Sequence, residues 1–204
     1  DQPPETRRRR GIYLLPNLIT TLALFFGFYA VVSAQAGVYE SAAIAIFVAM
    51  VMDGLDGRVA RLTNTQSDFG VQYDSIADMV SFGVAPAMVV YLWALSDLGA
   101  LGSVGSKLGW LGAFVYTACA GLRLARFNTQ VGVADKRYFQ GLPSPAAAAT
   151  IAGMVWAGDR LEFGGWPAGV PALIITTLAG ILMVSNVRYD SFKEIDFRYR
   201  VPFV

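Results

Sequence analysis

Histidine is absent from this chain of 204 residues, and cysteine occurs only once, at Cys119. Without an imidazole group, serine–histidine hydrolysis and histidine-ligated zinc sites are excluded. A single cysteine cannot form an internal disulfide, and Cys119 stands in an apolar run, so we interpret it as a small buried apolar residue. Charge is scarce as well. Only 15% of the residues are charged and 55% are hydrophobic, which leaves a soluble domain of this size short of polar surface.

The apolar residues fall in long blocks, which indicates a lipid bilayer as the solvent. The first block follows the Arg7–Arg10 run and has 23 uncharged residues, Asn17 to Tyr39. It is too long for the core of a signal peptide, so we interpret it as a transmembrane helix. Pro16 suits the start of that helix. The predicted membrane segments are Pro16–Gln35, Ser41–Leu62, Asp68–Leu95, Leu108–Asn128, Pro145–Ala157 and Pro167–Val187.

The predicted fold class is therefore an all-α integral membrane protein with six transmembrane helices. We expect one membrane domain over 1–204, made of a basic segment (1–15), a helical bundle (16–187) and a tail (188–204). The connections rich in Gly and Pro are Ala36–Glu40, Gly99–Lys107 and Gly164–Pro167.

Basic residues predict the orientation, because Lys and Arg concentrate on the cytoplasmic side of a membrane protein. With both termini in the cytoplasm, only Lys107 and Arg160 face the opposite side. The other 14 of the 16 basic residues are cytoplasmic: Arg7, Arg8, Arg9, Arg10, Arg58, Arg61, Arg123, Arg126, Lys136, Arg137, Arg188, Lys193, Arg198 and Arg200. We therefore expect an inner-membrane protein with both termini in the cytoplasm.

Four aspartates lie within or at the ends of the second and third apolar segments: Asp53, Asp56, Asp74 and Asp78. A carboxylate at membrane depth costs about 3 kcal/mol or more, so such residues face a polar cavity or bind a cation. Spacings of three and four place each pair on one helix face. Asp53 is eight residues before Arg61, about 12 Å deeper along the helix. Two short-connected antiparallel helices then present four carboxylates toward one end of the bundle.

An all-oxygen site of this kind suits hard divalent cations, Mg²⁺ or Mn²⁺. Four carboxylates carry too much charge for one such ion but suit two, and two metals can clamp a phosphate. Gly57, Ala60 and Gly70 leave room for a bulky phosphorylated ligand, and Arg61 can bind phosphate oxygens. The acids alone are equally compatible with a structural cluster or with an ion path through a transporter.

The spacing of these residues resembles the signature of the CDP-alcohol phosphotransferase family. It reads Asp53-x2-Asp56-Gly57-x2-Ala60-Arg61-x8-Gly70-x3-Asp74-x3-Asp78, with all eight defining positions present. The resemblance implies a six-helix membrane fold, a homodimer and a site open to the cytoplasm. It also implies that the four aspartates bind two metal ions and that Asp78 is the general base. The residues that it implies near the cytidine nucleotide are Gly57, Ala60, Arg61, Gly70, Asn17 and Thr20, although a helix cap explains Asn17 equally well.

Within the family, the stretch from Arg123 to Pro145 resembles membrane-type phosphatidylserine synthases. It contains Arg123-Leu-Ala-Arg126-Phe-Asn128-Thr and Phe139-x-Gly141-Leu-Pro143-Ser-Pro145. The resemblance implies CDP-diacylglycerol and L-serine as substrates, and phosphatidylserine and CMP as products. An arginine can bind the serine carboxylate through two hydrogen bonds. The candidate acceptor-binding residues are Arg123, Arg126, Asn128 and Ser144; the arginines would otherwise serve only the positive-inside bias.

Two other interpretations stay open at this stage. The first is a member of the same family with glycerol 3-phosphate, inositol phosphate or diacylglycerol as acceptor. The second is a divalent-cation transporter, which predicts further acids toward the far side of the membrane. After Asp53 and Asp78 the helices carry no acid before Glu40 and Asp97, at the opposite surface, and this one-sided distribution favours an enzyme site. Membrane lipids are expected partners, and no nucleic-acid partner is expected.

Overall fold

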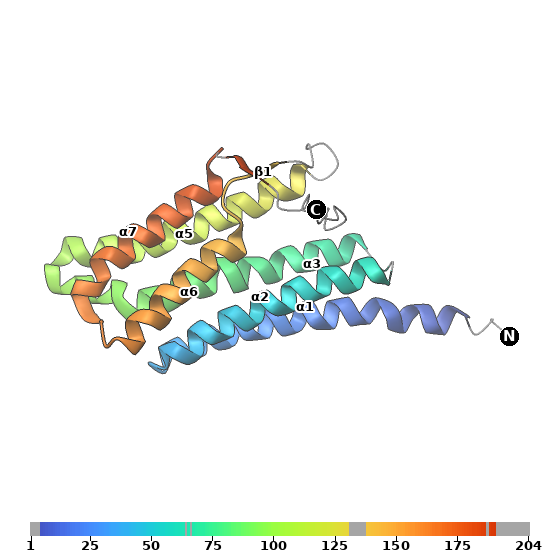
Figure 1. The fold of residues 1–204 in the computed structure, drawn as a ribbon, viewed down its shortest axis with the longest axis horizontal. Helices are drawn as coiled ribbons and strands as arrows, with labels where there is room; N and C mark the ends of the chain where they lie inside the picture. Colours follow the sequence, from blue (N-terminus) through green and yellow to red (C-terminus); the bar gives the residue numbers. More distant parts are fainter. Residues whose placement is uncertain (1–4, 64, 66, 131–137, 187, 191–204) are drawn as a thin grey trace, which may run out of the picture.

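The computed structural model describes residues 5–63, 65, 67–130, 138–186 and 188–190, and the side chains of 15–63, 65, 67–129 and 141–186. Six long helical rods in this part of the chain pack side by side along one axis (Figure 1). The first two rods are α1 (Glu5–Gln35) and α2 (Tyr39–Leu62), and the last three are α5 (Ser103–Gln130), α6 (Ser144–Arg160) and α7 (Gly165–Val184). The fold class predicted from the sequence is confirmed.

The third rod spans residues 68–101 and changes its winding along its length. It consists of α3 (Asp68–Asp78), the π-helix η1 (Met79–Val84), α4 (Ala85–Val90), the π-helix η2 (Tyr91–Leu95) and the 3₁₀-helix η3 (Ser96–Leu101). Neighbouring rods donate hydrogen bonds to carbonyls in the wider π turns. Tyr116 Oη donates to Phe82 O at 3.0 Å, and Tyr39 Oη donates to Leu92 O at 2.8 Å. These bonds fix the third rod against α5 and α2.

Several predicted boundaries differ from the observed ones. α1 begins at Glu5, so Pro16 lies inside the helix instead of at its start. A proline removes one backbone donor, which a long helix of otherwise favourable residues tolerates. The predicted connection Gly99–Lys107 is largely helical. Only Gly102 interrupts it, with φ at +92°, a conformation that glycine adopts without strain.

Four of the rods are long and apolar enough to cross a membrane: Leu15–Gln35, Asp68–Leu101, Ser103–Thr129 and Gly165–Val184. α2 also has the length, with 24 residues, but it carries five charged ones, and α6 has only 17 residues. Six membrane segments were predicted. The two that do not meet this test are the second, which corresponds to α2 and carries Asp53 and Asp56, and the fifth, which corresponds to α6 and is the shortest. α2 and α6 pack on each other, and α2 also packs along α1, while each of the two keeps an exposed side.

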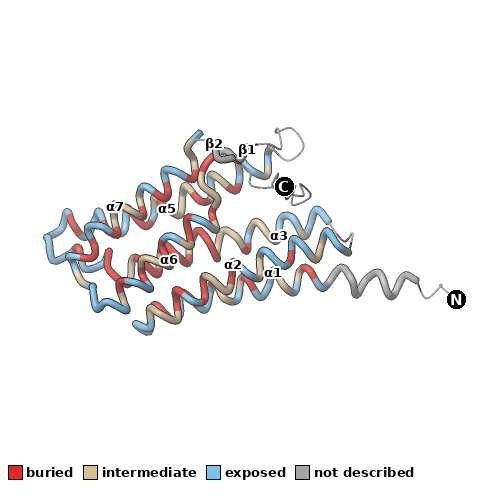
Figure 2. Tube along the Cα trace, viewed as in Figure 1, coloured by how far each residue is buried: buried red, intermediate tan, exposed pale blue. Residues whose placement is uncertain are grey.

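Small side chains form much of the core. α2 contributes Ala42, Ala45 and Ala49, and α6 contributes Ala148 and Ala152, all of them at most 3% exposed. Figure 2 shows the buried positions on the sides where the rods face one another, and exposed positions on the outer sides of α1, α5 and α7. Large apolar side chains occupy those outer sides, among them Phe28, Phe114 and Ile174. Such a surface is suited to contact with lipid chains.

Two short strands join the segments that follow α5 and α7. β1 (Tyr138–Gln140) pairs antiparallel with β2 (Arg188–Asp190), and Phe139 is opposite Tyr189. Both strands lie at the end of the molecule to which α5 runs (Figure 1). Of the basic residues used for the orientation, the side chains of 7–10, 136–137, 188, 193, 198 and 200 lie outside the described residues.

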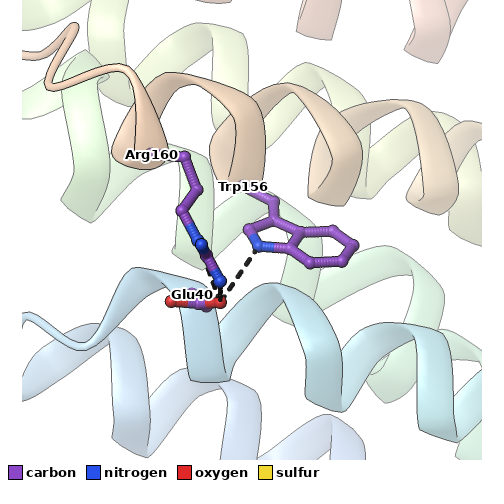
Figure 3. A network of polar contacts seen from close by, with 3 residues as sticks. All are labelled: Glu40, Trp156 and Arg160. Atoms are coloured by element: carbon purple, nitrogen blue, oxygen red, sulfur yellow. Dashed lines mark hydrogen bonds and ion pairs between the residues drawn. The ribbon is translucent and has the colours of Figure 1, made fainter.

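A polar network closes the opposite end of the bundle (Figure 3). Glu40, in the first turn of α2, forms an ion pair with Arg160 at the end of α6. Trp156 Nε1 donates to the same carboxylate oxygen of Glu40 at 3.3 Å. The hydrogen bond from Arg160 holds the pKa of Glu40 below its usual value. Since α2 begins here, its aspartates lie further along, toward the other end of the molecule.

Candidate metal and substrate site

α2 and α3 present their aspartates to each other, as the spacing predicted. One carboxylate oxygen from each of Asp53, Asp56 and Asp74 can be chosen so that all three lie within 4.8 Å of one another. Asp78, the last residue of α3, is not one of these three, but its carboxylate lies close enough to Asp53 for the two to interact. The four carboxylates thus form one cluster, with Asp56 buried and the other three half-buried.

The start of α3 is fixed by its own sequence. The Ser67 hydroxyl accepts a hydrogen bond from the Gly70 backbone N–H at 3.1 Å, as an N-cap residue does. This cap places the first helical residue at Asp68 and so sets which face carries Asp74 and Asp78. The cap is a local signal that the sequence contains.

The carboxylate cluster has the properties of a divalent-cation site. Neighbouring oxygens around a bound Mg²⁺ are about 3 Å apart, and opposite ones about 4 Å, so the three oxygens need little movement to share one ion. Asp74 Oδ1 is buried and has no hydrogen-bond partner in the described part of the chain. A buried carboxylate oxygen without a partner is costly unless a cation or water satisfies it. Both the donor set and the unsatisfied oxygen therefore fit a hard divalent ion.

α1 forms a third wall of this cluster. Thr20 is buried, and its hydroxyl donates to Asp56 Oδ2 at 2.6 Å. The next residue, Thr21, shares a hydrogen bond of 2.9 Å with the hydroxyl of Tyr73, which precedes Asp74. Thr21 and Tyr73 were not predicted from the sequence, where an exposed Thr and Tyr beside apolar residues carry no distinctive signal.

The other residues predicted near a nucleotide lie on α1, α2 and α3, the helices that also carry Thr20 and the aspartates. Apart from the adjoining backbone of α2, no atom of the described residues lies within 4 Å of the position that a Cβ on Gly57 would occupy, so the surface there is open. Ala60 and Gly70 are half-buried, and Asn17 Oδ1 is 3.5 Å from the corresponding Cβ position of Gly70. Arg61 is exposed and donates from Nε to the carbonyl of Gly57 at 2.9 Å. Asn17 is inside α1, so the helix-cap alternative for this residue is wrong.

The predicted acceptor residues separate into three locations. Arg123 Nη1 donates to the buried Ser144 Oγ at 2.6 Å, and the Arg123 guanidinium lies near enough to Asp78 for their charges to attract. Arg126 Nη2 donates to Asn186 Oδ1 at 3.0 Å, at the end of α7. Asn128 Nδ2 donates to Ser75 Oγ at 3.0 Å, on α3. Of the four, Arg123 is the one whose charge acts on Asp78, with Ser144 as its partner, whereas Asn128 is bonded next to Asp74 through Ser75.

One nitrogen of Arg123 is still available for a ligand. Its Nε is buried and lacks a hydrogen-bond partner among the described residues. Burying an unsatisfied guanidinium donor costs free energy that a bound anion would recover. Ser75, the partner of Asn128, and Asn186, the partner of Arg126, were not identified from the sequence. The only feature of the sequence that could have pointed to Ser75 is its position between Asp74 and Asp78.

Comparison with known proteins agrees with this geometry. Residues 13–187 match the family model described as CDP-alcohol phosphatidyltransferase. A CDP-diacylglycerol–serine O-phosphatidyltransferase of Helicobacter pylori is 36% identical over 93% of this chain and 77% of its own length. The enzyme of the same name from Methanocaldococcus jannaschii is 32% identical over 93% of this chain and 80% of its own.

A solved structure has a similar fold. It is the phosphatidylinositol phosphate synthase of Mycobacterium tuberculosis with CDP-DAG bound, with a TM-score of 0.56. The similarity covers 88% of this chain and 87% of the other, at 18% sequence identity.

Proposed function

The chain belongs to the CDP-alcohol phosphatidyltransferase family, and on that premise we propose that it transfers the phosphatidyl group of CDP-diacylglycerol to L-serine. The products are phosphatidylserine and CMP. The main structural support is that two parts of the site lie close together: the cluster of Asp53, Asp56 and Asp74, and the guanidinium of Arg123, which is near enough to Asp78 for their charges to attract. Relatives that carry the name of this activity support the choice of serine.

The four aspartates would hold two divalent cations, Mg²⁺ or Mn²⁺. When bound, such ions neutralise the diphosphate of the substrate and stabilise charge that develops on its oxygens. The unpartnered Asp74 Oδ1 and the short distances between the carboxylates support this role. The open surface at Gly57 and the exposed guanidinium of Arg61 are suited to the nucleotide end of the substrate, together with Asn17, Ala60 and Gly70.

Serine is held on the α5 and α6 side of the cluster. The unpaired Nε of Arg123 donates to the serine carboxylate, while Ser144 holds the guanidinium in place through Nη1. The attraction between Arg123 and Asp78 brings the serine hydroxyl toward the carboxylate of Asp78. Asn128 bonds to Ser75, which stands between Asp74 and Asp78, and Arg126 bonds to Asn186 after α7; both would contribute at the edge of the serine site.

The reaction is a substitution at phosphorus. Asp78 accepts the proton of the serine hydroxyl as the hydroxyl oxygen bonds to the phosphorus that carries diacylglycerol. The bond from this phosphorus to the oxygen of CMP breaks, and CMP leaves with the electron pair. A carboxylate has a reference pKa of about 4 and is a weak base for an alcohol, so proton transfer is late and depends on charge stabilisation around the phosphate.

A release assay tests the acceptor directly. Detergent-purified protein is given CDP-diacylglycerol and a divalent cation, and CMP is measured with serine, with glycerol 3-phosphate, with inositol phosphate or without an acceptor. We expect release that depends on serine and stops with a chelator. Release with another acceptor would leave the family assignment intact but replace the substrate. Cation uptake into liposomes without CMP release would instead support a transporter.

Substitution of Asp78 tests the base. Asp78→Asn keeps the size of the side chain but removes its ability to accept a proton. We expect turnover to be lost while CDP-diacylglycerol binding, measured by equilibrium binding of the labelled lipid, stays largely intact. Unchanged turnover would remove Asp78 from the mechanism. We also propose that the site is open to the cytoplasm and that the protein is a homodimer. Cross-linking in native membranes tests the dimer.

A further inference from the structure

Thr20 is the one described hydroxyl that donates to an aspartate of the cluster. It was predicted to lie near the nucleotide, but its donor is directed to Asp56. Its oxygen is 2.6 Å from Asp56 Oδ2 and 3.1 Å from the carbonyl of Pro16. A hydroxyl has one proton, and a hydrogen bond to a charged carboxylate is the shorter and stronger of the two. The proton therefore belongs to the bond with Asp56.

Burial makes this hydrogen bond consequential. Thr20 is 4% exposed and Asp56 is 5% exposed, so water does not replace the bond when it is lost. A carboxylate has two oxygens, and fixing Oδ2 restricts rotation of the whole group. α1 is itself held against α3 by Thr21 and Tyr73, and against η1 by the bond from Ser81 Oγ to Ala23 O at 3.0 Å. The orientation of Asp56, on α2, therefore depends on the position of α1 and, through α1, on that of the third rod.

We propose that Thr20 is a positioning residue that sets the cation affinity of the aspartate cluster by holding Asp56. This inference rests on the proposed function only in assuming that the cluster binds a divalent cation. Partners that orient a ligating carboxylate change metal affinity by about 10–100-fold when removed, because the ligand must then be ordered when the metal binds. The same residue does not need to touch the nucleotide or serine.

Direct binding of Mn²⁺ to the full-length, detergent-purified protein, followed by electron paramagnetic resonance, tests the proposal without any turnover. Thr20→Val preserves the shape of the side chain and removes the hydroxyl. We expect its Mn²⁺ affinity to fall about tenfold or more. Thr20→Ser restores the donor and should bind nearly as tightly as the unsubstituted protein. If Thr20→Val does not fold, Thr20→Ala removes the same hydroxyl and takes its place.

Thr150→Val is a matched control. Thr150 Oγ1 lies 3.0 Å from the carbonyl of Ala146, four residues before it, much as Thr20 Oγ1 lies 3.1 Å from the carbonyl of Pro16, but among the described residues Thr150 has no aspartate as partner. We expect Thr150→Val to keep the Mn²⁺ affinity unchanged. Equal affinity of Thr20→Val and the unsubstituted protein would overturn the role of Thr20. Equal loss in Thr20→Ser and Thr20→Val would also overturn it, because packing would then be the cause.

The same measurement separates this proposal from the one before it. If the unsubstituted protein binds no Mn²⁺, the metal site itself is wrong and the role of Thr20 falls with it. If the unsubstituted protein binds Mn²⁺ and Thr20→Val binds it equally, only the role of Thr20 is wrong. CMP release measured across Mn²⁺ concentrations gives a second readout. There we expect Thr20→Val to need more Mn²⁺ for half-maximal rate and to approach the unsubstituted rate at saturation.

Discussion

Arg123 connects the two halves of the candidate site, because it reaches toward Asp78 from α5 and is held by Ser144 from α6. A lysine at this position would supply the same positive charge. It would not supply the same donors, because only a guanidinium can bond to Ser144 through Nη1 and leave Nε for a carboxylate. The geometry of the donor, more than its charge, is therefore what should determine serine binding.

We expect Arg123→Lys to raise the KM for serine by about tenfold or more, the loss of one charge-assisted hydrogen bond. The KM for CDP-diacylglycerol should change little, because Arg61 and the aspartates face that substrate. Steady-state CMP release with each substrate varied in turn measures both constants. Arg160→Lys, at the far end of the bundle, is the control and should leave both unchanged. A rise confined to the KM for CDP-diacylglycerol would contradict serine binding by Arg123.

At the scale of the helices, the crossing of α1 and η1 determines where α1 places Thr20 beside the aspartate cluster. A Cβ on Gly27 would meet Ser81 Oγ at 2.5 Å and Ser81 Cα at 2.7 Å. Ser81 is fully buried in the π-helical turns directly after Asp78, so it cannot move aside to make room for a Cβ on residue 27. Glycine is required here by close approach of two backbones.

Gly27→Ala should therefore destabilise the protein by about 1–3 kcal/mol through overpacking. It should also lower serine-dependent CMP release, since α1 would be displaced from the rod that carries Asp74 and Asp78. Thermal unfolding in detergent measures the first effect. Gly153→Ala on α6 is the matched control, because no described residue outside the adjoining backbone of α6 has an atom within 4 Å of its Cβ position. It should melt at the same temperature or higher, because alanine favours a helix over glycine by about 0.5–1 kcal/mol. Equal melting of both variants would contradict the close crossing.

In these rods, the sequence predicted what depends on local helix geometry but not what depends on contacts between rods. Period and spacing identified the carboxylate pairs of α2 and α3, because both pairs depend only on local helix geometry. The π-helical turns were not predicted, since no residue type encodes them and they depend on partners such as Tyr116, from another rod. For the same reason Thr20 was predicted near the nucleotide: its partner Asp56 is 36 residues away, and only packing brings the two together.

At the scale of the whole molecule, the two ends of the bundle differ in chemistry. The aspartate cluster lies in the second halves of α2 and α3, toward the end of the molecule at which α2 ends and α3 begins (Figure 1). The other end carries the Glu40–Arg160 pair, where α2 begins and α6 ends. A substrate with a water-soluble nucleotide and two acyl chains needs a polar site near one membrane surface, bordered by lipid. The positive-inside pattern predicts that this surface is the cytoplasmic one.

Labelling of single cysteines tests this orientation. The chain has one native cysteine, so Cys119→Ser provides a background without a thiol. Leu62 closes α2 and is 83% exposed, and Leu161 follows α6 and is 77% exposed, so Leu62→Cys and Leu161→Cys are a matched pair at opposite ends. A maleimide that cannot cross membranes should label Leu62→Cys only in inside-out vesicles, and Leu161→Cys only in right-side-out vesicles. Labelling of both from one side would mean that α2 and α6 do not span the bilayer as a packed pair. The reverse pattern would put the aspartate cluster on the outer surface, away from cytoplasmic CDP-diacylglycerol and serine, and the proposed activity would lose its substrates.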